Sequence, residues 1–240
     1  MTRAMLTLTK IIVSTLASLL LFSCQIEQGS AKVVAQTRQI AEPFDKISVS
    51  DGVDVILTQS QTTSVNVEAD DNLIDHIRTT VVGGTLHIEI KKRGLIDFTE
   101  KNVHVHLPVL TGISASTGSD VKSTNEFRTE TLDLSASSGS EITFVTSADR
   151  ITARSSSGSE IELSGMALYF DAQASSGSSI KASRMLCNEV SASASSGSDV
   201  RVHPIKELRA TASSGASVDY YKNPERISQN TSSGGSIRQK

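Results

Sequence analysis

The sequence predicts an all-β protein, built as a right-handed β-solenoid of about seven coils of ~19 residues with an N-terminal β-rich capping segment. Three observations lead to this prediction. A Ser-Gly motif recurs at nearly constant spacing, apolar and polar residues alternate on both sides of each copy, and the chain has no Trp and few aromatic residues for a conventional core. No period near 3.6 residues, which a helix would require, runs through the repeats.

Residues 1–23 resemble a bacterial export signal. A basic start is followed by an apolar run over residues 11–22, which is too short to cross a bilayer as a helix of about 20 residues. The run ends in Leu21-Phe22-Ser23-Cys24, which resembles the lipobox of bacterial lipoproteins. The resemblance implies cleavage before Cys24 and acylation of its thiol, with palmitate as a typical acyl group. An ordinary secretory signal cleaved nearby is the alternative.

Residues 24–42 are polar and lack periodicity, so we expect a flexible tether between the lipid and the folded domain. Gln25 stands where an Asp would favour retention at the inner membrane. The sequence therefore predicts an exported lipoprotein anchored in the outer membrane through Cys24 and facing the periplasm or the exterior. Acylation of Cys24 leaves Cys187 without a disulfide partner, and its apolar neighbours predict a buried structural thiol.

Residues 43–110 alternate like strands but lack the Ser-Gly motif. Within them, residues 81–86 predict a hairpin around Gly83-Gly84, and residues 70–77 predict a short helix with an Asp at its N-cap. We expect this segment to cover the first coil, because an open-ended solenoid must protect its strand edges. It would be continuous, as one domain, with the repeats of residues 111–240.

Seven copies of the motif follow one another at spacings of 18 to 21 residues. Three residues after each Gly stands Ile or Val, a type suited to stacked strands. Seven residues before it stands a large apolar residue in most copies, and the positions five and three before it are mostly Ala. Each Gly is expected to form a tight corner, with the two preceding residues bonding its backbone groups. The corner glycines are Gly118, Gly139, Gly158, Gly177, Gly197, Gly215 and Gly234.

A stack of antiparallel hairpins is the alternative fold, because a Ser-Gly pair also suits a hairpin turn. The two folds differ in how each repeat pairs with the next. Coils of a solenoid pair in parallel, whereas successive hairpin strands pair antiparallel.

Acidic residues recur two positions after the corner glycines. In a solenoid they would form a column, and like charges about 5 Å apart repel one another. Either they point into water, which we favour, or a cation lies among them; calcium takes six to eight oxygen ligands. The candidate calcium ligands are Asp120, Glu141, Glu160 and Asp199. His87, His104 and His106 are a second, weaker candidate group, for zinc or copper.

No catalytic residue and no other cofactor are predicted. The Ser-Gly-Ser segment is a periodic corner, whereas an enzyme activates one Ser, and no Gly-x-Ser-x-Gly elbow is present. Nucleic acid is not an expected partner either, since 23 Lys and Arg against 26 Asp and Glu provide no basic field.

Four blocks in order resemble the bacterial family called putative auto-transporter adhesin, head GIN domain. They are Ile47–Val55, Val65–Asp70, Gly84–Ile88 and Val103–Leu110, which runs into the repeats. The resemblance covers about residues 43–237 and implies an exported protein, often a lipoprotein, with a β-solenoid-like fold. The resemblance implies no catalytic motif in this chain.

The expected function is that of a non-catalytic cell-envelope lipoprotein, an adhesin-like module whose Ser- and Thr-lined face binds a glycan or an envelope protein. A structural protein that self-associates through solenoid faces or ends is the alternative. A polysaccharide-active enzyme ranks third, because it would need clustered acids and bases in a groove.

Overall fold

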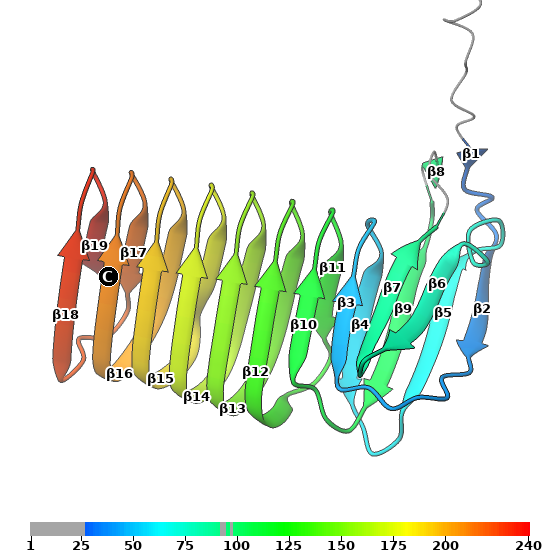
Figure 1. Ribbon diagram of the computed structural model, residues 1–240, viewed down its shortest axis with the longest axis horizontal. Helices are drawn as coiled ribbons and strands as arrows, with labels where there is room; N and C mark the ends of the chain where they lie inside the picture. The colour runs from blue at the N-terminus through cyan, green and yellow to red at the C-terminus, as the bar shows by residue number, and fades with distance from the viewer. Residues whose placement is uncertain (1–26, 92–94, 97) are drawn as a thin grey trace, which may run out of the picture.

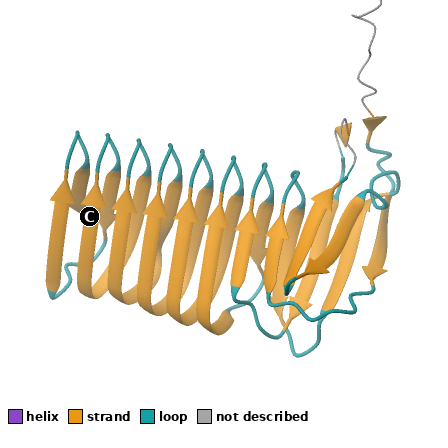
Figure 2. Cartoon of the chain, in the orientation of Figure 1, coloured by secondary structure: helices purple, strands orange, loops and turns teal. Residues whose placement is uncertain are grey.

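The structure is a computed structural model that describes residues 27–91, 95–96 and 98–240. The predicted signal and Cys24 lie outside these residues. Within them the chain forms nineteen strands joined by turns and no helix, hence no helix long and apolar enough to cross a membrane. All but two short strands, β1 (Glu27–Gln28) and β8 (Leu95–Ile96), join in one continuous sheet (Figures 1 and 2).

The sheet coils into a rod, and each coil has two walls that meet at a tight corner on one edge and a wider bend on the other (Figure 1). We call the wall that leads into the corners the pre-corner wall and the wall that leaves them the post-corner wall. The longest strands start on the post-corner wall, pass the bend and end on the pre-corner wall of the next coil: β13 (Glu141–Ser155), β14 (Glu160–Ala174), β15 (Ser179–Ala194) and β16 (Asp199–Ala212).

Shorter strands complete both walls at the two ends of the rod. The pre-corner wall also contains β3 (Lys46–Val49), β10 (Gly112–Ala115), β12 (Phe127–Ala136) and β18 (Arg226–Thr231). The post-corner wall also contains β4 (Asp54–Gln59), β11 (Asp120–Ser123), β17 (Ser217–Tyr220) and β19 (Ser236–Gln239).

Every pairing between strands of the repeats is parallel, which confirms the predicted solenoid and excludes the stack of antiparallel hairpins. The β-branched residues three after each Gly lie directly beside one another, as Val121, Ile142 and Ile161 illustrate. These three side chains are almost fully buried, and the Ala columns on the facing wall are buried as well. In the last coil Ile227 is 42% exposed, because no further described coil covers it.

An eighth corner precedes the seven that the sequence predicts. β3 and β4 pair in parallel with β10 and β11, and the corner between them has Asp51 and Gly52 at φ +63° and +74°. The later corners have the same backbone conformation. Residues 43–110 therefore contribute a coil of the solenoid as well as its cap.

The cap adds one further layer beyond this first coil. β7 (Thr85–Ile90) pairs in parallel with β3, and β9 (Lys101–Leu107) pairs in parallel with β4. Antiparallel strands then border the layer: β5 (Ser64–Asp70), β6 (Ile77–Val82) and β2 (Val33–Arg38). β2 lies within the stretch that the sequence predicts as a tether, so those six residues are part of the sheet.

The hairpin predicted at Gly83-Gly84 is confirmed, whereas the predicted helix over residues 70–77 is wrong. Residues 71–76 form consecutive turns instead, because Asp70 is engaged elsewhere. Its buried carboxylate accepts the backbone N–H groups of Ala31, Thr99 and Glu100, each at 3.1 Å. A single potential helical turn does not outweigh such tertiary bonds.

Each corner is a type I′ turn, and the corners inside the rod are bonded to both neighbouring coils. In one of them the N–H of Ser140 donates to the carbonyl of Ser137 at 3.2 Å, and Ser138 and Gly139 have φ of +53° and +71°. The Gly139 N–H donates to Ser157 of the next coil at 3.1 Å. The Ser137 N–H donates to the preceding coil, so the ladder of hydrogen bonds continues through the corners.

The buried hydroxyl that supports a corner belongs to the residue after the Gly, not to the two residues before it as the sequence predicts. In the fourth repeat, the Ser178 hydroxyl donates to the Ser155 carbonyl of the preceding coil at 2.7 Å and accepts from the Ser175 N–H at 3.2 Å. Ser178 is 3% exposed. The sixth repeat has Ala216 at this position, equally buried and without a hydroxyl.

Ser178→Ala should therefore lower the free energy of unfolding by about 1 kcal/mol, the net worth of a typical buried hydrogen bond. Ala216→Ser should raise it by a similar or smaller amount, since it adds the missing hydroxyl at an equivalent corner. Urea denaturation of both variants measures the two changes. Equal stabilities for both variants and the wild type would contradict this role of the hydroxyl.

Candidate binding surface

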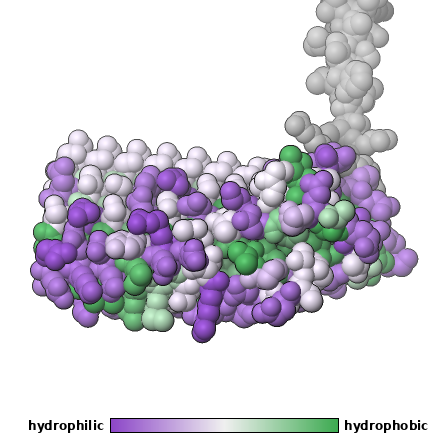
Figure 3. All heavy atoms as spheres, turned by 60° about the horizontal axis from the view of Figure 1, so that its bottom comes forward, coloured by the Kyte–Doolittle hydropathy of each residue, from purple (hydrophilic) through white to green (hydrophobic). Residues whose placement is uncertain are grey.

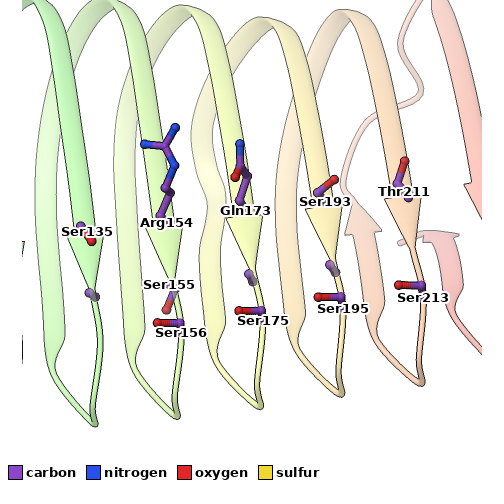
Figure 4. A pocket seen from close by; sticks show the side chains of 13 residues that line it. Ser135, Arg154, Ser155, Ser156, Gln173, Ser175, Ser193, Ser195, Thr211 and Ser213 are labelled. Carbon is purple, nitrogen blue, oxygen red and sulfur yellow. The ribbon is translucent and has the colours of Figure 1, made fainter.

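The pre-corner wall presents an extended polar surface beside the corners. We call it the hydroxyl zone, and it consists of the outward side chains four and two positions before the corner glycines. Figure 4 shows all of them except Ser137 standing in two rows across neighbouring coils. All of them except Ser137 line a shallow groove of about 490 Å³. The zone comprises Ser135, Arg154, Gln173, Ser193 and Thr211 in one row, and Ser137, Ser156, Ser175, Ser195 and Ser213 in the other.

Strand register sets the spacing of this zone. Arg154, Gln173, Ser193 and Thr211 are direct neighbours on successive parallel strands, which lie about 4.8 Å apart. All four are exposed, so their donors and acceptors are available to a partner. The arrangement can form repeated hydrogen bonds with an extended polar ligand.

Farther from the corners the same wall changes character. We call this part the aromatic zone: Arg150, Tyr169, Asp171, Glu189 and Arg209, which line a smaller groove of about 210 Å³. The guanidinium carbon of Arg150 lies 4.7 Å from the centre of the Tyr169 ring, a cation–π contact. Asp171 accepts a hydrogen bond from the side-chain amide of Gln173 at 2.9 Å, which links the two zones.

Glu207 closes this groove on the side of the last coils. Arg226 donates to its carboxylate at 2.7 and 3.1 Å, and Arg209 lies 2.5 Å from its other oxygen. The hydrogen bonds from Arg226, followed by the charges of both arginines, lower the pKa of Glu207. The carboxylate therefore stays ionised and holds both side chains in place.

The predicted acidic column is present on the post-corner wall. Asp54 extends it by one coil toward the cap, followed by Asp120, Glu141 and Glu160 on adjacent strands. Ser179 then separates these residues from the fourth predicted ligand, Asp199, which lies 2.9 Å from Arg201.

Calcium binding stays a prediction, and the geometry lends it no support. Basic side chains neutralise both ends of the acidic column, with Lys101 3.4 Å from Asp54 and Lys181 2.5 Å from Glu160. Burial raises the pKa of Asp120 in the middle of the column, and the charges of Asp54 and Glu141 raise it further. No group of three or more potential metal ligands is arranged to hold an ion in the described part of the chain.

The three histidines do not come together. His87 lies in β7 on the side of the pre-corner wall, whereas His104 and His106 lie in β9 on the side of the post-corner wall. The candidate zinc or copper trio is therefore not formed. The Nε2 atom of His104 instead lies 3.5 Å from the carboxylate of Glu68.

Cys187 is buried, as the sequence predicts, and is 1% exposed. Burial raises the pKa of its thiol to about 12, which keeps it protonated and unreactive at neutral pH.

A third groove, of about 600 Å³, runs along the bends and is more apolar than the other two. Met166, Leu168 and Leu186 are 54%, 45% and 41% exposed along it. Figure 3 looks toward this side of the rod and shows hydrophobic residues gathered among hydrophilic ones.

The sequence pattern does not predict two features of these surfaces, the aromatic zone and the groove at the bends. The position eight residues before each corner Gly faces outward, and it contains Arg150, Tyr169, Glu189 and Glu207 in successive repeats. Once the repeats are aligned, this column is the signal that points to the aromatic zone.

The sequence profile of one family matches residues 43–224, and that family is described as putative auto-transporter adhesin, head GIN domain. The chain belongs to this family. The resemblance noted in the sequence is therefore confirmed, and it places the chain among exported, envelope-associated proteins by description. A search among curated proteins found no significant match.

Solved structures share the fold of this head GIN domain protein. A putative adhesin from Bacteroides fragilis has a TM-score of 0.83 at 22% identity, covering 89% of this chain and 100% of that one. A putative lipid binding protein from Parabacteroides distasonis has a TM-score of 0.72 at 19% identity, covering 90% and 100%. A putative adhesin from Parabacteroides merdae has a TM-score of 0.71 at 17% identity, covering 89% and 98%. At these identities the likeness establishes the fold alone.

Asp120→Asn should stabilise the protein at neutral pH. The raised pKa of Asp120 means that the folded protein binds its proton more tightly than the unfolded chain does, so the ionised form lowers stability. The loss of stability caused by ionised Asp120 is fully present above the pKa of Asp120 in the folded protein. It disappears as the pH falls and Asp120 becomes protonated in both the folded and the unfolded states.

Thermal denaturation at neutral and at acidic pH measures this difference. The midpoint of Asp120→Asn should exceed that of the wild type at neutral pH, and the gap should close in acid. Asp133→Asn, at an exposed position on the other wall, is the control. A variant that is less stable than the wild type at neutral pH would contradict the argument.

Proposed function

We propose that this protein is a non-catalytic, adhesin-like binding module of the cell envelope, which holds a glycan or a protein against its pre-corner wall. The observation that carries the proposal is the hydroxyl zone, a row of exposed hydroxyl, amide and guanidinium groups on in-register strands. The family description supports it, and so do the names of the similar structures. These names describe putative adhesins and a putative lipid binding protein, and none describes an enzyme.

The physical advantage of such a wall is preorganisation. Most side chains of the hydroxyl zone are short, and they stand on strands that are paired on both sides. Little conformational entropy is therefore lost when a ligand contacts them. The same contacts recur along the rod, so many weak hydrogen bonds act together on an extended partner. A globular small-molecule site would instead enclose its ligand.

The proposal includes a lipid anchor. The lipobox-like residues 21–24 support acylation of Cys24 and an attachment to the outer membrane, facing the periplasm or the exterior. The described chain starts with β1, beside the cap, so an anchor at Cys24 would attach at that end of the rod. Both walls would then remain accessible.

A lipid is the second candidate ligand, and the groove at the bends favours it. Met166, Leu168 and Leu186 provide an apolar lining, and one similar structure is described as a putative lipid binding protein. Methionine side chains adapt readily to flexible apolar ligands.

A charged side chain placed in the hydroxyl zone should weaken partner binding. The full chain in detergent micelles is screened against arrays of glycans and of envelope proteins, and the best binder is titrated against Ser193→Arg. We expect an affinity loss of about tenfold or more, because the new side chain obstructs the centre of the zone. Ser179→Arg, on the post-corner wall, is the matched control and should bind like the wild type.

Equal binding by Ser193→Arg and the wild type would contradict the proposed surface. Loss of binding in Leu186→Asp instead, with Ser193→Arg unaffected, would transfer the site to the bends and favour a lipid. A wild-type protein that binds no glycan, envelope protein or lipid, and that self-associates through its faces or ends, would favour the structural alternative.

A further inference from the structure

We propose that Tyr169 and the groove beside it form a subsite for a neutral sugar residue, so that the ligand of the pre-corner wall is a neutral polysaccharide. The inference rests on the proposed function and names both the class of the ligand and the residues that select it. It follows from the position of one aromatic ring, the polar groups around it and the balance of their charges.

Tyr169 is 40% exposed in the middle of the pre-corner wall. On this wall it and Ile227 of the last coil are the exposed large apolar side chains among the described residues. Arg150, one coil nearer the cap, covers one face of the Tyr169 ring. On the next coil Glu189 is the direct neighbour of Tyr169, and both residues line the groove of about 210 Å³.

The groove combines the two kinds of contact that a sugar ring requires. One side of a pyranose ring presents mainly C–H groups, which pack against an aromatic ring, and its rim presents hydroxyls that need hydrogen-bond partners. The Tyr169 ring supplies the first surface. Around it, Asp171 and Glu189 supply hydrogen-bond acceptors and Arg209 supplies donors. Ser191 supplies a hydroxyl that can both donate and accept a hydrogen bond.

The charges of the groove indicate a neutral ligand. It is lined by Asp171, Glu189 and Glu207, which are acidic, and by Arg150 and Arg209, which are basic. Arg226 adds a third positive charge, because the carboxylate of Glu207 pairs with both Arg209 and Arg226. Acidic and basic groups therefore nearly balance, so the groove offers no net attraction to a strongly anionic or cationic chain.

The surroundings of the groove favour a glycan over a protein partner. Protein interfaces depend on clusters of buried apolar and aromatic anchors. This wall offers one aromatic ring among hydroxyl, amide and charged groups, and the exposed apolar side chains Met166, Leu168 and Leu186 lie at the bends. From the groove, Asp171 and Gln173 lead into the hydroxyl zone, along which a longer chain can continue.

The test is affinity gel electrophoresis of the full chain in detergent, in gels that contain dextran, mannan, xylan or laminarin as neutral polysaccharides and polygalacturonate as an anionic one. At least one neutral polysaccharide should retard the wild type, with little effect of polygalacturonate. Tyr169→Ala should weaken that binding about tenfold, whereas Tyr169→Phe, which keeps the ring, should stay within about threefold. Tyr221→Ala is the matched control, since Tyr221 is also 40% exposed but lies outside the wall.

The outcomes separate this inference from the proposed function. Unchanged binding by Tyr169→Ala, with circular dichroism showing native folding for every variant, would overturn the subsite and leave the binding module intact. Retardation by polygalacturonate alone would overturn the neutral ligand. If the wild type binds an envelope protein but no polysaccharide, and Ser193→Arg loses that binding, the glycan ligand would be overturned and the pre-corner wall would remain the binding surface. Binding to none of these partners would overturn both proposals.

Discussion

The hydrogen-bonded corner is the constraint on which the rest of this structure depends. A type I′ turn needs two successive residues with positive φ, and at Ser138-Gly139 one of them is not glycine. The conformation persists because the Gly139 N–H and the Ser137 N–H bond to opposite neighbouring coils. Corners that bond in this way must lie one above another, so the strand segments next to them are held in register from coil to coil. The register shifts that do occur lie away from the corners, between Glu162 and Ser164 and between Ala182 and Glu189.

Register in turn gives each position of the repeat a fixed environment. The residue three after the Gly is buried in the core in every repeat except the last, where Ile237 is partly buried against it. Small residues on the facing wall let the two walls approach closely. Outward positions become columns with a spacing of about 4.8 Å. The columns differ in chemistry: the post-corner wall contains the acidic column, whereas the pre-corner wall contains the hydroxyl and aromatic zones. The proposed binding surface is therefore a direct consequence of the repeat.

The solenoid, its core columns and the burial of Cys187 could be predicted because they depend on strict periodicity. The first coil could not, because Asp51 replaces the usual Ser and 66 residues separate Gly52 from the next corner. The turns after Asp70 depend on distant backbone N–H groups that no local pattern reveals. The role of Tyr169 could not be predicted for a similar reason, since it depends on Arg150 and Glu189 on neighbouring coils rather than on residues of its own repeat.

Hydrogen–deuterium exchange of the full chain, with and without a saturating neutral polysaccharide, tests the central claim most directly. Because each long strand contributes to both walls, one experiment compares the two faces of the same coils. The account predicts new protection in residues 169–175 and 189–195, on the pre-corner wall, and unchanged exchange in residues 160–164 and 199–203 on the other. Protection confined to the post-corner wall or to the bends would contradict it.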